Sequence, residues 1–470
     1  MNRKIIIEPV TKVEGHGKVT INLDSKGEVK DAHFHVTEFR GFEKFCEGRM
    51  AWDMPVITTR ICGICPVRHH LASVKACDDL FGASIPSAAK KLRELMHMGQ
   101  FIHSHALHFF FLAAPDFVMG FDSDPAKRSV IGILEKDPVL AKKAIKLRKI
   151  GQTIIDKVGG RAIHPVTAIP GGMSKPLSHE DRFELTAQVK EAIELCKLAV
   201  EISEGLIEGH PAVDLGDIKT AHMGLVKDGK LELYDGMLRM VDSGGKLLEE
   251  FDPKKYLDYI GEHVEDYSYL KFPFYKKKGW PDGIYRVAPM SRINVADGIT
   301  TPLASAKFGK LAALKPMNEN RYYHYARTVE LLYAAERALE LLKDDEIVSK
   351  DVRVRVDRYD GPGEGIGVIE APRGTLIHHY HATEGKITKA NIIVATAHNN
   401  PAMDLSVAMV AKANIHKGKA DEGILNKVEM AIRCYDPCLS CSTHAIGNMP
   451  LALDIISDDG ETINHIRRDA

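Results

Sequence analysis

Two similar stretches set the strongest constraint on how this chain folds: RICGICPVRHH at Arg60–His70 and DPCLSCSTH at Asp436–His444. Each holds a Cys-x-x-Cys pair followed by a histidine, and the two pairs lie almost the full length of the chain apart. Four thiolates suit zinc, an iron–sulfur cluster, or nickel with iron. The two stretches therefore predict one metal site that brings the start and the end of the chain together.

The composition is that of a globular protein with a sizeable core. The 470 residues are 44% hydrophobic and 27% charged, and the formal net charge of -1 gives no reason to expect nucleic acid or an anionic membrane as a partner. No apolar run approaches the roughly 18 residues of a membrane helix, and the N-terminal run is too short for a signal peptide. We expect a cytoplasmic protein and, because the cysteine pairs must meet, a single domain over residues 1–470.

The hydrophobic pattern predicts an α+β fold in which helices predominate. Alternating residues in 4–36 predict a small N-terminal antiparallel sheet, and apolar residues at steps of three and four predict long core helices. Those helices are expected at 87–113, 184–207 and 327–344. Gly-rich and Asp-rich turns predict a β-containing insertion or lobe at about 220–300, and strands return after Val352, with a hairpin at the C-terminus.

Both cysteine motifs have features of helix starts. Asp436 is a good N-cap and Pro437 suits the first helical position, so we expect Cys438, Cys441 and His444 on one helix face. A thiol at a helix N-terminus has a lowered pKa and is ready for metal. The first motif leads into a short helix, 71–81, that Gly82 ends.

A structural zinc site is the ordinary interpretation of two Cys-x-x-Cys pairs. Three features favour a reactive metal centre. The pairs are far apart in a chain that has its own core and needs no zinc to stabilise it. Charged or hydrogen-bonding residues also surround the cysteines, and proteins use such neighbours to adjust the reactivity of a bound metal. Further polar motifs that zinc does not explain stand in apolar surroundings: EGH (14–16), RGFE (40–43), GGRAIHP (159–165) and EAPRG (370–374).

In this order the motifs resemble those of the large, catalytic subunit of nickel–iron hydrogenases. RICGICPVRH and DPCLSCSTH match its R-x-C-G-x-C-x-x-x-H and D-P-C-x-x-C-x-x-H signatures, and with EPVTKVEGH, EFRGFE, GGRAIHP and EAPRG the resemblance covers essentially the whole chain. It is closer to the cytoplasmic archaeal group whose enzymes reduce methyl viologen, do not use a deazaflavin and work with heterodisulfide reductase. HSHALHFFFLAAPDF, LRKIGQ, YLKFPFYKKKGWPDG and NNPAMD carry that closer likeness.

The resemblance implies a predominantly helical large-subunit fold and a nickel–iron centre. Cys62, Cys65, Cys438 and Cys441 would bind nickel, with Cys65 and Cys441 also bridging to an iron that carries carbon monoxide and cyanide. Pro372 and Arg373 would form the wall of the pocket around those small ligands. Thr396 would face a cyanide, and His69 would donate a hydrogen bond to a bridging sulfur. Glu43, the carbonyl of Ile392 and His444 would hold Mg²⁺ or another divalent ion.

The implied reaction is reversible heterolytic cleavage of dihydrogen. Cys438 or Arg373 would take the proton, Asp116 and Asp436 would form a charged canopy, and Glu14 would be the first proton-relay carboxylate. A relay group works best when its pKa lies near the working pH, and burial can raise a glutamate towards that value.

The four other cysteines are scattered, so we expect no iron–sulfur cluster in this chain. The resemblance implies an iron–sulfur small subunit, a ferredoxin-like adaptor, a flavin-containing heterodisulfide reductase and maturation factors. A maturation protease removes the segment matching residues 445–470 in many members, and both its retention and its removal stay open here. A deazaflavin-reducing or other cytoplasmic bidirectional hydrogenase is an alternative, and a zinc-stabilised structural subunit is an alternative of another class.

Overall fold

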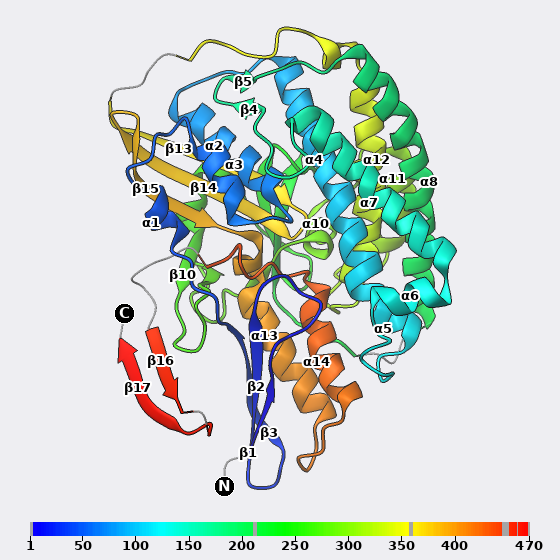
Figure 1. Ribbon diagram of the computed structural model, residues 1–470, viewed down its shortest axis with the longest axis vertical. Coiled ribbons are helices and arrows are strands. Elements are labelled where there is room, and N and C mark those ends of the chain that lie inside the picture. The colour runs from blue at the N-terminus through cyan, green and yellow to red at the C-terminus, as the bar shows by residue number, and fades with distance from the viewer. Residues whose placement is uncertain (1–2, 210–213, 357–360, 444–450, 458, 469–470) are drawn as a thin grey trace.

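Three N-terminal strands form an antiparallel sheet, as the alternating pattern predicts. β1 (Arg3–Ile7) pairs with β2 (Gly17–Leu23), and β2 pairs with β3 (Val29–Val36). The apolar face of this sheet is fully buried at Val19, Ile21 and Phe34. In this computed structural model, which describes residues 3–209, 214–356, 361–443, 451–457 and 459–468, the sheet packs on α13 (Ala395–Asn414), and α13 packs on α14 (Glu422–Cys434) (Figure 1).

Long helices make up the largest layer of the molecule. They are α4 (Ser87–Leu107), α7 (Pro138–Gly159), α8 (His179–Gly209) and α12 (Tyr322–Lys343), which run side by side in Figure 1. A Cβ on Gly151 would lie 2.5 Å from the backbone nitrogen of His103, so the glycine lets α7 approach α4 closely. The predicted helix at 87–113 is confirmed, with the difference that its last six residues, His108–Ala113, form a π-helical segment.

A second antiparallel sheet lies under the helix that carries the first cysteine motif. Its strands are β13 (Gly363–Ala371), β14 (Gly374–Thr383) and β15 (Lys386–Ile393), and α3 (Pro66–Leu80) packs on β13. A Cβ on Gly365 or Gly367 would lie 2.1 Å from a carbonyl oxygen of α3. These two glycines therefore allow the helix to lie directly against the strand.

The β-containing lobe predicted at about 220–300 is present. One sheet has the order β12-β6-β8-β9 with β7 beside β6, and β10 pairs with β11 in a separate hairpin. Its strands are β6 (Ala221–Lys227), β7 (Lys230–Leu231), β8 (Met237–Val241), β9 (Leu247–Phe251), β10 (Ile260–His263), β11 (Phe272–Tyr275) and β12 (Tyr285–Arg286). The short helix α9 (Tyr256–Tyr259) lies between β9 and β10, and α10 (Pro289–Val295) follows β12.

The predicted C-terminal hairpin is also present, as β16 (Leu451–Ile456) and β17 (Thr462–Arg468), and it lies at the edge of the molecule (Figure 1). The other short elements are α1 (Phe42–Cys46), α2 (Met54–Ile57), the 3-10 turns Thr58–Ile61, Pro253–Lys255 and Asp345–Val348, α5 (Ala114–Met119), α6 (Val130–Lys136), β4 (Ala168–Ile169), β5 (Gly172–Met173) and α11 (Pro302–Ala312). None of the helices in the described ranges is long and apolar enough to span a bilayer. The fold is α+β, as predicted.

Candidate metal centre

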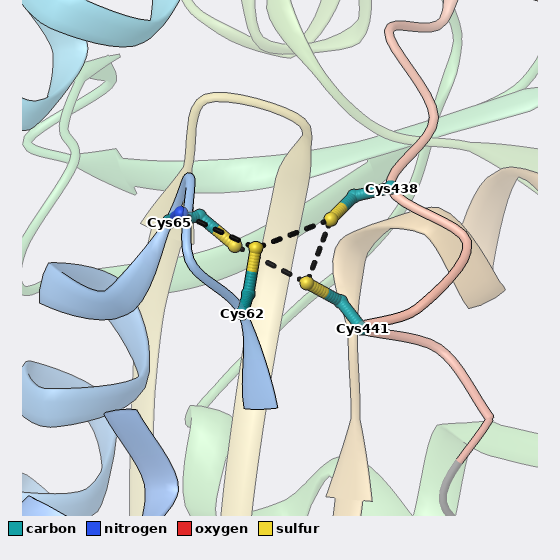
Figure 2. A group of neighbouring side chains, drawn as sticks. All are labelled: Cys62, Cys65, Cys438 and Cys441. Carbon is teal, nitrogen blue, oxygen red and sulfur yellow. Dashed lines mark hydrogen bonds between the residues drawn. The ribbon is translucent and has the colours of Figure 1, made fainter. Parts of the chain in front are cut away.

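The four patterned cysteines meet in the interior (Figure 2). Their sulfur atoms all lie within 4.8 Å of one another, and each residue is at most 3% exposed. The Sγ–Sγ distances are 3.5 Å between Cys62 and Cys438, 3.2 Å between Cys65 and Cys441, and 2.7 Å between Cys438 and Cys441. The predicted meeting of the two ends of the chain is confirmed.

The first cysteine motif adopts the predicted helix start, with Cys65 as the N-cap of α3. The helix predicted for the second motif is wrong. Cys438 and Cys441 lie in a turn after α14, and Asp436 has a left-handed φ of 55°. The expected capping groups have other partners: Asp436 binds Arg373, and the Cys438 N–H donates to Thr396 Oγ1 at 2.9 Å. His444 lies outside the described residues.

Arg40, from the RGFE motif, ties the two cysteine motifs together. Its Nη1 donates to the carbonyl of Ile61, just before Cys62, at 2.6 Å and to the carbonyl of Ser440, just before Cys441, at 3.0 Å. The sequence showed the motif but gave Arg40 no role. One guanidinium can bind two carbonyls at once because its donors form a rigid fork.

Glu14 lies against Cys438, the first cysteine of the second motif. Cys438 Sγ donates to Glu14 Oε2 at 2.9 Å, and the Ser440 N–H donates to the same oxygen at 3.2 Å. The Leu439 N–H also donates to the Glu14 carbonyl at 2.9 Å. Gly15 permits this approach, because its φ is 84° and a Cβ there would lie 2.8 Å from Leu439 Cβ. The EGH motif is thus a backbone clamp on the second cysteine motif.

Arg373 reaches the cysteine centre from the tight turn between β13 and β14. Its Nε donates to the Asp436 carbonyl at 2.6 Å, and its Nη2 donates to Asp436 Oδ1 at 2.9 Å, with both side chains buried. The third nitrogen, Nη1, has only a 3.5 Å contact with Ser104. At Gly374, where φ is 126°, a Cβ would lie 2.1 Å from Val287, so the EAPRG glycine is required for this turn.

A buried charge network fixes the same turn from behind. Arg292 donates to Glu330 at 2.6 and 2.7 Å, to Glu370 at 2.6 Å, and to the carbonyls of Ala371 at 3.0 Å and Pro372 at 3.3 Å. The three charged side chains are fully buried. Arg292 could not be found from the sequence, because it lies far along the chain from the turn that it holds.

The thiols show why a cation fits between them. Burial raises the pKa of Cys65, but hydrogen bonds with Cys438, Cys441 and Cys62 outweigh it and place the pKa well below its ordinary value. Burial, with the neighbouring sulfurs, instead raises the pKa of Cys438 and of Cys441. The thiolate of Cys65 is therefore favoured at the expense of those of Cys438 and Cys441. A divalent metal ion would allow all four to be deprotonated, because it supplies the positive charge that they lack.

Beside the sulfurs is a cavity of about 10 Å³, room for roughly one water-sized group and too small for an organic substrate. Its wall combines apolar side chains with donors: Leu376, Val394, Arg68, Arg373 and Thr396. Apolar walls with fixed donors suit small diatomic ligands. Arg68 is the functional candidate that sequence reasoning missed, although its place three residues after Cys65 puts it on the same helix face.

His69 also lines this cavity, next to Cys65. Its Nδ1 lies 3.0 Å from His378 Nε2, and His378 Nδ1 in turn lies 2.5 Å from the Tyr380 hydroxyl, which donates to Ser73. Burial lowers the pKa of His69, opposed by a hydrogen bond with the Cys65 sulfur. His69 is therefore hydrogen-bonded to the Cys65 sulfur, and His378 contacts the ring from the other side, whereas the role of Cys65 as a bridging ligand stays a prediction.

Asp116, which the resemblance places with Asp436 in a charged canopy, is not among the residues that line the cavity. It accepts hydrogen bonds from Lys12, from Arg433 Nη1 at 2.9 Å and from Asn426 at 3.3 Å. The salt bridge with Arg433 is almost fully buried. Asp116 thus anchors α14, the helix that leads into the second cysteine motif.

Glu43 lies in α1, next to the C-terminal end of β15. The Ile392 N–H donates to Glu43 Oε1 at 2.7 Å, and burial raises the pKa of this carboxyl to about 7. Glu43 thus contacts Ile392 through the backbone N–H of that residue, whereas the predicted ligand is its carbonyl, so the divalent-ion site stays a prediction.

The chain matches known proteins along most of its length. A family model described as nickel-dependent hydrogenase matches residues 40–135 and 239–444, and a HoxL-like model matches residues 4–39. The chain is 51% identical to the F420-non-reducing hydrogenase vhu of Methanocaldococcus jannaschii over 87% of this chain and 99% of that protein. It is 48% identical to the F420-non-reducing hydrogenase vhc of Methanococcus voltae over 96% of this chain and 97% of that protein.

Among solved structures, an NAD+-reducing NiFe hydrogenase in the H2-reduced state superposes with a TM-score of 0.90. It is 43% identical, and the match covers 94% of this chain and 99% of that one. These matches argue against a structural zinc site. They extend through the EGH, RGFE, GGRAIHP and EAPRG motifs, which a zinc site does not explain. With the motif order, the fold and the four-cysteine centre in agreement, the chain belongs to the nickel-dependent hydrogenase family, as a large, catalytic subunit.

Proposed function

We propose that this protein catalyses reversible heterolytic cleavage of dihydrogen at a nickel–iron group. Cys62, Cys65, Cys438 and Cys441 would hold the group, with Cys65 and Cys441 shared between nickel and iron. When bound, the group supplies open coordination positions at which dihydrogen is polarised. The observation that carries this proposal is the meeting of four buried thiols with a carboxylate 2.9 Å from one of them.

Cys438 is the base that the contacts favour. Its sulfur already donates to Glu14 Oε2 at 2.9 Å, so a proton taken up at Cys438 Sγ has a carboxylate within reach. Glu14 is partly exposed whereas Cys438 is buried, so this step moves the proton towards the surface. Ser440 donates its backbone N–H and its hydroxyl to Glu14 and holds the carboxylate in place.

Arg373 is a positioning residue rather than the base. Asp436 and the nearby thiolates oppose the effect of burial and raise the pKa of Arg373 above its already high ordinary value. A guanidinium held in this way keeps its charge and cannot accept a proton. Its Nη1, which is 3.5 Å from Ser104 Oγ, would with Thr396 and the apolar wall of Leu376 and Val394 suit carbon monoxide and cyanide ligands on the iron. Pro372 would shape this wall by holding the turn.

A second ion, Mg²⁺ or another divalent cation, would bind at Glu43, the Ile392 carbonyl and His444. The buried Glu43 supports this proposal, because an ion would supply the positive charge that its carboxylate lacks there. Glu43 also lies in the short helix that follows Arg40, which binds both cysteine motifs.

Electrons would leave through a small iron–sulfur subunit, then a ferredoxin-like adaptor and a flavin-containing heterodisulfide reductase, in the cytoplasm. The four remaining cysteines, Cys46, Cys77, Cys196 and Cys434, support a separate electron-transfer subunit, because each is buried and outside the one cysteine cluster of the described residues. The relatives named as F420-non-reducing are 48% and 51% identical, which favours a deazaflavin-independent enzyme. The 43% identity of the NAD+-reducing structure keeps a bidirectional, nicotinamide-coupled hydrogenase as the second candidate.

The test is dihydrogen-dependent dye reduction by the complex purified from its own host. We expect reduction of methyl viologen under dihydrogen, copurification of an iron–sulfur subunit, and no reduction of a deazaflavin. Reduction of NAD+ by the purified complex would support the second candidate instead. Intact mass would show whether maturation factors remove residues 445–470.

A further inference from the structure

A second group of metal-binding side chains lies outside the cysteine centre, on one face of the β13–β14 hairpin. It consists of Glu364 in β13 and His379 and His381 in β14, whose ligand atoms all lie within 4.8 Å of one another. The sequence motifs gave none of these three residues a role, and the proposed reaction uses none of them.

The strand register brings the three side chains together. His379 and His381 are two residues apart in β14, so they point to the same face of the sheet. Glu364 is the direct cross-strand partner of His381, which makes it the diagonal neighbour of His379. All three positions belong to the unbroken pairing of β13 with β14, although the pairing of β14 with β15 shifts register just after His381. The backbone therefore holds the group without a flexible loop.

Both imidazoles point their Nε2 atoms at the same carboxylate oxygen. Glu364 Oε1 lies 2.6 Å from His379 Nε2 and 3.9 Å from His381 Nε2, and the two ring centroids are 4.7 Å apart. Ligands about 2.1 Å from a tetrahedral metal lie roughly 3.4 Å from one another. The two measured distances bracket that separation, so small side-chain movements would centre an ion between the three atoms.

His379 has the orienting contact that metal-binding histidines commonly have. Its ring is almost fully buried, and its Nδ1 lies 2.9 Å from the Tyr256 hydroxyl, to which Asn391 Nδ2 donates at 2.9 Å. With Nδ1 engaged on the inner side, Nε2 faces Glu364 and His381. The side chains of Glu364 and His381 are 53% and 41% exposed, so an ion can enter from solvent.

We propose that Glu364, His379 and His381 bind a divalent transition-metal ion of the Zn²⁺, Co²⁺ or Ni²⁺ class. Two imidazole nitrogens and one carboxylate oxygen suit these ions, whereas Mg²⁺ and Ca²⁺ prefer ligand sets made of oxygen. The site lies at the open end of the hairpin whose turn carries Arg373. A bound ion would fasten β13 to β14 at the end opposite that turn.

The test uses Co²⁺ as the probe, added to the purified hydrogenase complex whose cysteine centre is already filled. We expect one equivalent of Co²⁺ to bind, with a ligand-field spectrum of nitrogen and oxygen ligands and without the sulfur-to-cobalt charge-transfer band that cysteines would give. His381→Asn and Glu364→Gln should each weaken Co²⁺ binding at least tenfold. Both residues are partly exposed, so these variants should fold.

His416→Asn is the matched control, because His416 is an exposed histidine that pairs with one carboxylate, Glu28, at 3.1 Å and belongs to neither of the metal-binding groups found among the described residues. It should bind Co²⁺ as the parent complex does. Equal Co²⁺ affinity in the parent and in both His381→Asn and Glu364→Gln would overturn the proposal. Failure of the parent complex to take up Co²⁺ would also overturn it, whatever the hydrogenase activity.

Discussion

The contact between Cys438 Sγ and Glu14 Oε2 is the most informative single contact in the centre. Glu14→Gln keeps the size of the side chain and one oxygen to accept the Ser440 N–H, and its amide N–H can donate to the Ser440 hydroxyl, but an amide cannot carry the proton. We expect dihydrogen-dependent dye reduction to fall by about 10² or more, the range for loss of a proton-transfer group, while nickel stays bound.

Glu8→Gln is the control, because Glu8 is an exposed carboxylate on the same N-terminal segment, where it pairs with Lys18. Its activity should match the parent. Loss of nickel from the Glu14→Gln enzyme, measured by metal analysis, would mean that Glu14 builds the centre rather than relaying protons.

Glu43 makes stability depend on pH. Burial raises its pKa from 4.5 to about 7, so the folded protein binds this proton more tightly than the unfolded chain does. Its contribution to stability is therefore complete below about pH 4.5 and is lost as the pH rises through about 7. With a chelator present, we expect the free energy of unfolding of the parent to fall by up to about 3 kcal/mol over this pH range relative to that of Glu43→Gln.

Denaturant unfolding of both proteins from pH 4.5 to 8 measures this difference. Added Mg²⁺ should restore the parent at pH 8 and leave Glu43→Gln unchanged. A constant difference between the two proteins across the pH range would show that Glu43 keeps an ordinary pKa.

At single residues, the sequence predicted chemistry well and contacts less well. The four cysteines were found because their spacing marks them, and Glu14 and Arg373 were found because their motifs resemble those of the hydrogenase family. Asp116 was assigned to the canopy, yet its carboxylate binds Lys12 and Arg433. Contacts between residues hundreds of positions apart depend on the whole fold, and local spacing does not carry them.

Among the elements, the loop at Gly15 should control the approach of Glu14 to Cys438. Gly15→Ala adds a Cβ that would lie 2.8 Å from Leu439 and Ser440, at a φ of 84°. We expect it to lower dye reduction at least tenfold by displacing the relay. Gly48→Ala is the matched control, since Gly48 has a φ of 78° and open space around it.

Gly48→Ala should cost about 1 kcal/mol of stability through backbone strain and leave turnover unchanged. Equal activity losses in the two variants, measured at equal nickel content, would assign the effect to backbone strain and not to the contact.

The β13–β14 turn depends on the Arg292 network. Glu370→Gln removes one buried charge from the Arg292 pair, and we expect the folded protein to lose about 2 to 4 kcal/mol in urea unfolding. Glu384→Gln, at the exposed turn between β14 and β15, should change stability by less than about 0.5 kcal/mol. Equal stabilities of the two variants would mean that the network does not hold the turn.

Elements with a clear period were predicted from sequence, and the failure at Asp436 is caused by contacts with distant parts of the chain. Asp–Pro before a polar stretch is a good helix start, but a capping carboxylate must be free to bind the backbone. Here Arg373 takes the carboxylate and the Glu14 loop takes the backbone. Both partners come from distant segments, so no local pattern could reveal the competition.

For the whole molecule, four paired cysteines predicted that the chain ends meet, and the fold shows what keeps them together. Arg40 binds both motifs, the EGH loop clamps the second, and Arg292 supports the turn that carries Arg373. The sequence could predict the meeting because a metal site requires it. It could not predict the supporting residues, because several arginines are buried and the sequence does not show which of them lies beside the centre.

The nickel X-ray absorption spectrum of the complex, matured in its own host, tests the central claim most directly. The account predicts about one nickel per chain, surrounded by sulfur from four cysteines with iron nearby. Zinc in place of nickel, or nickel bound without sulfur neighbours, would contradict it.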